Sequence, residues 1–146
     1  MYKHILISTD GSDVAQKGVD HGLGLAKALG ARVTLITVTE SFPIYASAGA
    51  GWVSTEMANY DEIQKEHAER ILANAKQAAD GLGVVAETLY VANASPAEAI
   101  VETAKSRGCD VIAMASHGRR GIGRLLLGSQ TSEVVSHAPV PVLVVR

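Results

Sequence analysis

The sequence has little of what marks secreted, membrane-spanning and nucleic-acid-binding proteins. Among 146 residues there is one cysteine, Cys109, so no internal disulfide can form, which fits a reducing compartment. No apolar run approaches the ~18 residues of a membrane span. The short apolar run behind the N-terminus is smaller than the roughly 7–15 residues of a secretory signal. A net charge of −2 argues against a broad nucleic-acid surface. We therefore expect one cytoplasmic domain with no membrane span and no nucleic-acid partner.

The common signatures of catalysis and metal binding are also missing. The sequence has no G-x-S-x-G nucleophile elbow, no P-loop lysine pattern and no paired-carboxylate motif. The isolated His4, His21 and His137 do not have the spacing of metal ligands. Because no nucleophile is accompanied by a base, the sequence favours binding over turnover.

What the sequence does contain is a regular alternation of strand and helix patterns. Short apolar or β-branched runs predict five strands, at residues 4–9, 32–39, 84–92, 110–115 and 140–145. Helical spacing of apolar residues predicts four helices between them, at residues 13–29, 59–80, 96–107 and 129–137. Such an alternation implies a parallel sheet with helices on both faces.

Several local signals fix where the predicted helices begin and end. Ser12 or Asp13 is expected to cap the first helix and Gly30 to stop it, and Ser95 is expected to cap the third. Residues 40–55 are predicted to be one long irregular segment. The second helix is expected to bury a face made of Ile63, Ile71, Ala75 and Ala78.

The fourth predicted strand is followed by a glycine-rich basic loop that opens a helix at Ser129. Glycines let the backbone approach an anion closely, and a helix N-terminus offers unpaired N–H groups. This order predicts a phosphate site, to which the Ser129 and Thr131 hydroxyls and the loop arginines add contacts. The alternative is a solvated loop whose arginines face water. The residues of the loop that carry this prediction are Gly118, Gly121, Gly123, Gly128, Arg119, Arg120 and Arg124.

Two polar residues beside this loop have several possible roles. Asp10 ends the first strand, where its carboxylate can bond a ribose hydroxyl, hold a metal or cap the next helix. His117 is either an acid or base, or a turn residue. Ligands of parallel sheets lie beyond the carboxyl ends of the strands. Asp10, Val38 and residues 115–129 are therefore predicted to converge on one crevice if the first and fourth strands are neighbours.

Three segments resemble the universal stress protein family, and the likeness covers the whole length. They are residues 3–12, 95–97 and 139–145. The ATP-binding branch of that family carries G-x2-G-x9-G-[S/T], and Gly118, Gly128 and Ser129 match its later part. Ala115 stands at the first glycine of the motif. If that position needs a positive φ, alanine costs roughly 1–2 kcal/mol; if it needs only close approach, one methyl fits.

The resemblance implies one universal stress protein domain over residues 1–146. Its fold would be α/β, with an open five-stranded parallel sheet in strand order 3-2-1-4-5 and helices on both faces, Rossmann-like and adenine nucleotide alpha hydrolase-like. Asp10 would then contact adenine or ribose, the backbone of Val38 the adenine edge, and Ala115 the ribose. The expected ligand is ATP, or AMP or ADP, with Mg²⁺. The implied site comprises Ser8, Thr9, Asp10, Val38, Met114, Ala115, His117, Gly118, Arg119, Gly128, Ser129, Gln130 and Thr131.

The function implied by the resemblance is an ATP-binding stress-response or signalling module with little or no turnover. A nucleotide-free interaction protein on the same fold is one alternative. An ATP-using enzyme is the other, because residues 8–13 faintly resemble the S-G-G-x-D-S loop of pyrophosphate-releasing synthetases. Proteins of this kind usually dimerise, often through the last strand, and an unpaired apolar edge at residues 142–145 would favour aggregation. We therefore expect a homodimer or higher oligomer and an unidentified protein partner.

Overall fold

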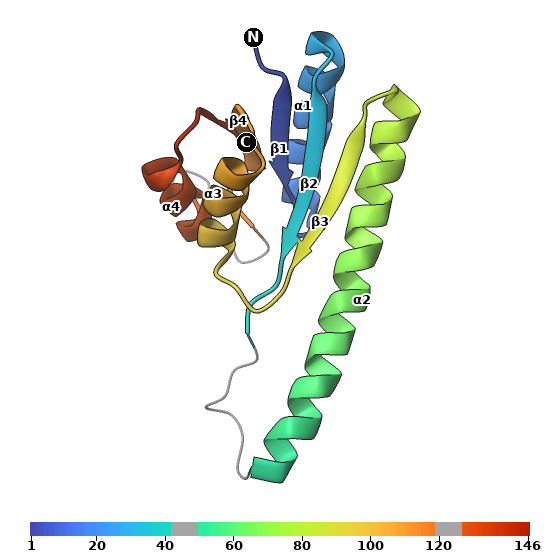
Figure 1. The fold of residues 1–146 in the computed structure, drawn as a ribbon, viewed down its shortest axis with the longest axis vertical. Helices are drawn as coiled ribbons and strands as arrows, with labels where there is room; N and C mark the ends of the chain where they lie inside the picture. The colour runs from blue at the N-terminus through green and yellow to red at the C-terminus, as the bar shows by residue number, and fades with distance from the viewer. Residues whose placement is uncertain (42–49, 119–126) are drawn as a thin grey trace.

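The computed structural model describes residues 1–41, 50–118 and 127–146, with the backbone alone at residues 50–54. Strands and helices alternate along the chain as the sequence predicts (Figure 1). The fourth helix has the predicted bounds, whereas the strands are shorter by one to three residues. The elements are β1 (His4–Ser8), α1 (Asp13–Leu29), β2 (Arg32–Val38), α2 (Ala50–Leu82), β3 (Ala86–Val91), α3 (Pro96–Ser106), β4 (Val111–Ala115), α4 (Ser129–His137) and β5 (Val142–Val145).

The five strands form one parallel sheet in the order β3-β2-β1-β4-β5, which confirms the predicted order. The chain builds β1, β2 and β3 outward in one direction and then returns to place β4 on the other side of β1. The strand order therefore reverses between β1 and β4. In open sheets of this kind, ligands bind beyond the carboxyl ends of the strands at such a reversal.

Two separate cores cover the two faces of the sheet. Because successive side chains of a strand point to opposite faces, Ile5 and Ile7 face α1 and α2 while Leu6 faces α3 and α4. The core under α1 and α2 also contains Val19, Leu23, Val33, Leu35, Leu72 and Ala75. The core under α3 and α4 also contains Ile36, Ile100, Ala104, Ile112, Met114 and Val134. Strands buried on both faces explain the continuous apolar runs of the sequence.

The ends of α1 are set by the predicted residues. The Ser12 side chain accepts a hydrogen bond from the Ala15 N–H at 3.2 Å, so Ser12 is the N-cap. Gly30 adopts the left-handed conformation, with φ +64°, and its N–H bonds the last turn of the helix. Both signals act within one helical turn, which is why the sequence alone identifies them.

The second helix differs from the prediction at its beginning and in its buried face. Helix α2 begins at Ala50, whereas the chain was expected to be irregular as far as residue 55. Among its described side chains, the buried ones are Ala68, Leu72, Ala75 and Ala79. Of the predicted face, Ala75 is buried and Ile71 is half-buried, whereas Ala78 is exposed and Ile63 is 65% exposed. The N-terminal part of α2 extends past the end of the sheet (Figure 1), so this part of the helix has no sheet to cover.

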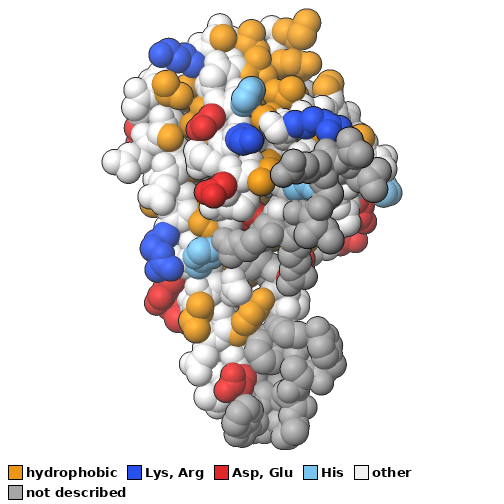
Figure 2. Space-filling model, turned by 180° about the vertical axis from the view of Figure 1, so that it is seen from behind, with side chains coloured by type: hydrophobic (Ala, Val, Ile, Leu, Met, Phe, Trp, Pro, Cys, Tyr) orange, Lys and Arg blue, Asp and Glu red, His pale blue; other side chains and the backbone are white. Residues whose placement is uncertain are grey.

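The surface of the protein mixes charges of both signs. On the face shown in Figure 2, acidic and basic side chains are interspersed, and hydrophobic side chains gather toward its upper end. Within the described ranges, no helix combines the length and the apolarity that crossing a membrane requires.

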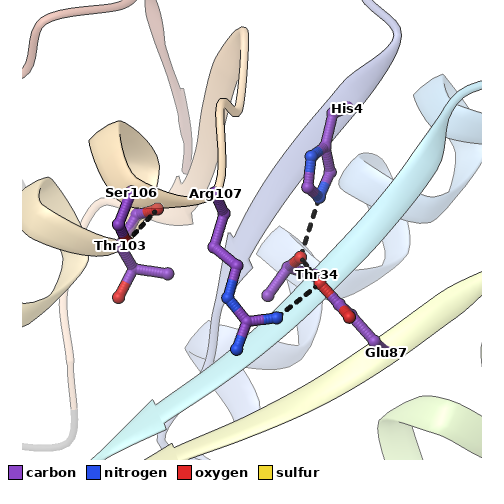
Figure 3. A network of polar contacts seen from close by, with 6 residues as sticks. All are labelled: His4, Thr34, Glu87, Thr103, Ser106 and Arg107. Carbon is purple, nitrogen blue, oxygen red and sulfur yellow. Dashed lines mark hydrogen bonds and ion pairs between the residues drawn. The ribbon is translucent and has the colours of Figure 1, made fainter.

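A chain of polar side chains crosses the sheet from β1 to β3 and continues to the end of α3 (Figure 3). The Thr34 hydroxyl donates to Glu87 Oε1 at 2.8 Å, and Arg107 Nη1 donates to the same oxygen at 2.8 Å. Because the single Thr34 proton is used in this way, His4 Nε2 must be the donor in its 2.8 Å contact with Thr34 Oγ1. Burial, followed by the charge of Arg32, lowers the pKa of His4 below 6.5. The hydrogen bond from Thr34, followed by that from Arg107, lowers the pKa of Glu87.

These two shifts predict that stability falls as pH is lowered. With a depressed pKa in the folded protein, His4 takes up a proton in the unfolded chain first, so stability decreases as pH falls below 6.5. Glu87 adds a further decrease below its ordinary value of 4.5. Urea unfolding from pH 7 to pH 5 should therefore show a smaller slope of stability against pH in His4→Gln. The exposed His21→Gln is the control, and equal slopes in wild type and His4→Gln would contradict the assignment.

Candidate functional site

The carboxyl ends of β1 and β4 lie side by side and are held by the neighbouring strands. The register pairs Ile7 with Ala113, which places the residues after β1 beside the end of β4. The Thr9 N–H donates to Ile36 O at 3.0 Å, and the buried Thr37 hydroxyl donates to Thr9 O at 2.9 Å. Thr9 is thus fixed on both sides, and the turn that follows it starts from a rigid position.

The turn after β1 directs Asp10 toward the loop after β4. Asp10 Oδ1 accepts the Ser12 N–H at 2.9 Å, while Asp10 Oδ2 lies 3.1 Å from the position a Cβ on Gly118 would take. Gly11 has φ +80°, and a Cβ there would meet the Ile71 side chain at 2.7 Å. The carboxylate of Asp10 therefore caps the turn through one oxygen and borders the candidate site through the other.

The two ends of the glycine-rich loop are clamped together. The Gly128 N–H donates to Ser116 O at 2.8 Å, and the Ser116 N–H donates to Val145 O at 2.8 Å. A Cβ on Gly128 would lie 3.3 Å from both Ser116 O and His117 Cα. Gly128 itself has φ −59° and ψ 154°, an ordinary extended conformation. Glycine is therefore needed here for space and not for an unusual backbone angle.

Ala115, which replaces the first glycine of the motif, fits its position without strain. It is the last residue of β4 and is buried. Among the described non-glycine residues, Asn93 alone has a positive φ. The alternative in which alanine strains the backbone is thereby excluded. The backbone at Ala115 is also approached closely by α1, since a Cβ on Gly18 would lie 2.9 Å from the Ala115 nitrogen.

Helix α4 begins at Ser129, directly after Gly128, whose N–H bonds Ser116 O. The N–H groups of its first turn have no acceptor within the helix. The Thr131 hydroxyl, expected to reach a phosphate, instead donates to Ala115 O at 3.0 Å and joins α4 to β4.

Gln130 Oε1 accepts the Ala97 N–H at 3.0 Å, and Ser95 makes no side-chain cap bond. Gln130 therefore caps α3 in place of the predicted Ser95.

His117 has one partner and one unpaired nitrogen. Its Nδ1 lies 2.9 Å from Ser116 Oγ, while its Nε2 is buried and has no hydrogen-bond partner among the described residues.

Sequence reasoning missed Ser116 and Thr37, two buried residues that orient this edge. The register of β1 with β2 would have placed Thr37 beside Thr9, whereas nothing in the sequence signals the bond of Ser116.

The remaining predicted residues lie around this edge or outside the described ranges. Val38 and Ser8 end β2 and β1 and are half-buried, and Met114 is buried in the core under α3 and α4. Arg119, with the other loop residues at 119–126, lies outside the described residues.

Two hollows of the described surface lie away from this edge. One of about 70 Å³ lies between α3 and α4, and one of about 280 Å³ lies beside Gly30 and Gly83.

The whole chain matches the model of one known protein family. The profile of the universal stress protein family matches residues 1–146. The chain belongs to the universal stress protein family. The universal stress protein YxiE of Bacillus subtilis is 36% identical over 149 residues, covering 100% of both chains. The structure of the universal stress protein UspA from Lactobacillus plantarum superposes with a TM-score of 0.85 at 25% identity, over 99% of this chain and 98% of the other.

Some solved universal stress proteins contain nucleotides. One in complex with cAMP has a TM-score of 0.72 and 25% identity to this chain, covering 99% of this chain and 97% of the other. A complex with dAMP from Archaeoglobus fulgidus and one with AMP from Arabidopsis thaliana share the fold, with TM-scores of 0.70 and 0.68 at 18% and 15% identity.

Proposed function

We propose that this universal stress protein binds an adenine nucleotide at the carboxyl edge of β1, β2 and β4 and acts as a stress-response or signalling module. The observation that carries the proposal is the pair of glycines. At Gly118 a side chain would press on Asp10, and at Gly128 it would press on the backbone of Ser116 and His117. Glycines leave the backbone without side chains at two positions beside the start of a helix, so a phosphate can approach the backbone N–H groups closely.

The ligands of the solved relatives support an adenine base. The three complexes contain cAMP, dAMP and AMP, which share adenine and differ in sugar and phosphate. In this chain the backbone of Val38 would meet the adenine edge, Asp10 and Ala115 the ribose, and Gly118, Gly128 and Ser129 the phosphates. ATP is the proposed physiological ligand, with ADP and AMP as weaker or alternative ones.

Magnesium would come with the nucleotide. Within the described part of the chain, no group of three His, Cys, Asp or Glu side chains could hold a metal ion. Magnesium usually keeps several waters and binds through phosphates and one or two carboxylates. Asp10 is the carboxylate that borders the described part of this edge, so the ion would be held mainly by phosphate oxygens and water.

Calorimetric titration with ATP, ADP and AMP in the presence of Mg²⁺ tests this function. We expect saturable binding of the adenine nucleotides and weaker binding of GTP, which has a different base edge. A thermal-shift series with the same ligands gives an independent readout, because a ligand that binds the folded state raises its stability. No heat and no thermal shift at millimolar ATP would leave the nucleotide-free interaction protein as the function.

Turnover of ATP is expected to be slow. In the described residues at this edge, no acid–base pair is positioned to activate water, and the His117 Nδ1 is engaged with Ser116. Phosphate release should therefore stay well below about 1 s⁻¹, the lower end of dedicated enzymes. A faster rate that disappears in His117→Ala would contradict this and make His117 an acid or base.

The proposed assembly is a homodimer joined through β5. This strand is at the edge of the sheet, and its residue Leu143 is 37% exposed, while Val135 on the adjacent α4 is 46% exposed. Pairing two copies of β5 would satisfy the free backbone groups of the edge.

Leu143→Lys is therefore expected to convert a dimer into a monomer of 15.2 kDa in light scattering. Ile63→Lys is the matched control, because Ile63 is 65% exposed on α2, away from β5. A wild-type protein that is monomeric at tens of micromolar would rule out a stable interface here.

A further inference from the structure

A hollow of about 280 Å³ lies at the amino end of the sheet, between the turn from α1 to β2 and the turn from α2 to β3. Both turns are at the upper end of the molecule in Figure 1. The proposed nucleotide edge is at the opposite end of the strands, and the seven residues of β2 put roughly 20 Å between the two. A short segment bound in this hollow would therefore leave the nucleotide edge accessible.

The two turns that border the hollow are built alike and leave it open. Gly30 has φ +64° and Gly83 has φ +74°, and a Cβ on either would have nothing within 4 Å. The residue after each glycine donates its N–H to a carbonyl in the last turn of the preceding helix, at 2.9 Å in both cases. Backbone hydrogen bonds thus hold both walls, so binding here needs no rearrangement of the turns.

Apolar side chains form the floor of the hollow and continue onto the surface around it. Ala31 and Val84 line it and are buried, whereas the neighbouring Val85 lines it and is 77% exposed. Leu29 and Leu82, which directly precede the two glycines, are also exposed. Figure 2 shows hydrophobic side chains gathered at this same end of the molecule. Single exposed apolar side chains are ordinary, but several of them around a hollow mark an interaction site.

The rim of this apolar hollow is basic. Lys27, in the last turn of α1, and Arg32, at the start of β2, both line it and are exposed. Lys3 adds a third exposed cation next to Arg32, since the Arg32 N–H donates to Lys3 O at 3.0 Å. None of the three forms an ion pair with another described residue.

The acidic side chains of this end are already engaged within the chain. Asp80, in the last turn of α2, pairs with Lys76 at 2.6 Å. Asp110 accepts the Lys3 backbone N–H at 2.7 Å, and Glu87 pairs with Arg107 at 2.8 Å. The rim therefore has an excess of positive charge that a partner with acidic groups would complement.

The size and shape of the hollow favour a side chain of a partner protein over a lipid surface. Its volume exceeds the roughly 150 Å³ of a cavity that holds benzene and is below the roughly 300 Å³ at which pockets for drug-sized ligands begin. One large aliphatic or aromatic side chain, or two, would fill it. A bilayer instead receives apolar side chains that project from a protein, and the net charge of −2 gives this chain no general attraction to an anionic membrane.

We propose that the hollow at the amino end of the sheet docks a short segment of a partner protein that inserts a large apolar side chain and has acidic residues on both sides of it. The apolar side chain would pack on Ala31, Val84 and Val85, and the acidic groups would meet Lys27 and Arg32. This surface is separate from the nucleotide edge, and the proposal holds whether or not a nucleotide binds.

Synthetic peptides provide the probe. The first has a leucine–phenylalanine pair flanked by two glutamates on each side, the second has lysines in place of the glutamates, and the third has alanines in place of the apolar pair. We expect fluorescence anisotropy to show saturable binding of the first peptide below about 1 mM, at least tenfold weaker binding of the other two, and a loss of affinity as salt is raised. Backbone amide NMR should place its largest shifts at Gly30, Gly83 and Val85.

Two surface variants with matched controls test the apolar and the charged contact separately. Val85→Asp should weaken binding of the first peptide at least about tenfold, because it removes the apolar contact and adds a like charge. Lys27→Gln should weaken it about two- to fivefold, the range of an exposed ion pair. Ile63→Asp, at another exposed apolar position of α2, and Lys17→Gln, at another exposed lysine of α1, should bind as the wild type does.

The contrary outcomes are equally distinct. Equal affinity for all three peptides, or unchanged binding in a folded Val85→Asp, would overturn the proposal, as would no binding of the first peptide at 1 mM. Co-sedimentation with phosphatidylglycerol vesicles that bind better than the peptide would replace it by a membrane surface. Broadening of the Gly30 and Gly83 amide signals with protein concentration alone would show that a second copy of this chain covers the hollow instead.

Discussion

Replacing Gly128 by valine is expected to abolish nucleotide binding and leave the chain folded. The new Cβ would lie 3.3 Å from Ser116 O and His117 Cα, and its two methyl groups would fill the space beside them. The backbone of Gly128, at φ −59° and ψ 154°, accepts a β-branched residue without strain. We therefore expect the side chain to occupy the phosphate position while the fold persists, with affinity for ATP reduced at least about a hundredfold, or 2.7 kcal/mol.

The same substitution elsewhere provides the control. Gly81 lies near the end of α2, and a Cβ there would have nothing within 4 Å. Gly81→Val should bind ATP as the wild type does, while Gly128→Ala should fall between wild type and Gly128→Val because one methyl group displaces less. Calorimetry gives the affinities and circular dichroism checks the fold. Unchanged ATP binding in a folded Gly128→Val would place the phosphates away from this loop.

Gly18→Ala is expected to destabilise the protein, because the added methyl group would press on the backbone of β4. The Cβ would lie 2.9 Å from the Ala115 nitrogen and 3.2 Å from the Met114 carbonyl carbon. Both atoms belong to the backbone of β4, an inner strand of the sheet, so neither can rotate away. Helix α1 would have to move outward, and overpacking of this kind costs about 1–3 kcal/mol.

Gly24 on the same helix makes the comparison sharp. A Cβ there would have nothing within 4 Å, so Gly24→Ala should stabilise α1 by roughly 0.5–1 kcal/mol because alanine has the higher helix propensity. Urea unfolding of the two variants should therefore give changes of opposite sign. If Gly18→Ala were as stable as Gly24→Ala, the close packing of α1 against β4 would be wrong.

Sequence reasoning was most successful where a signal acts locally. Ser12 and Gly30 end α1 through contacts within one turn, and the strand order follows from the alternation of strands and helices together with the family resemblance. The buried face predicted for α2 was right at Ala75 but wrong at Ala78 and at Ile63, which is 65% exposed. The N-terminal part of this helix extends past the end of the sheet. No local pattern tells how far a helix extends past the sheet that it covers.

The candidate site illustrates the same limit. The glycines were identified from the sequence, but the reason for them was not, because only the fold shows Gly128 pressed against Ser116 and His117. The bond from Ala97 to Gln130 joins residues 33 positions apart and takes the capping role expected of Ser95. The choice between strain and close approach at Ala115 also required the backbone angles of the folded chain.

Backbone amide NMR of the ¹⁵N-labelled chain, titrated with ATP and Mg²⁺, reports both whether the nucleotide binds and which residues it contacts. We expect the largest shifts at Gly118, Gly128 and Ser129, with smaller ones at Asp10 and at the end of β2. Shifts concentrated elsewhere, for example around the hollow between α3 and α4, or no shifts at millimolar ATP, would contradict the proposed nucleotide site.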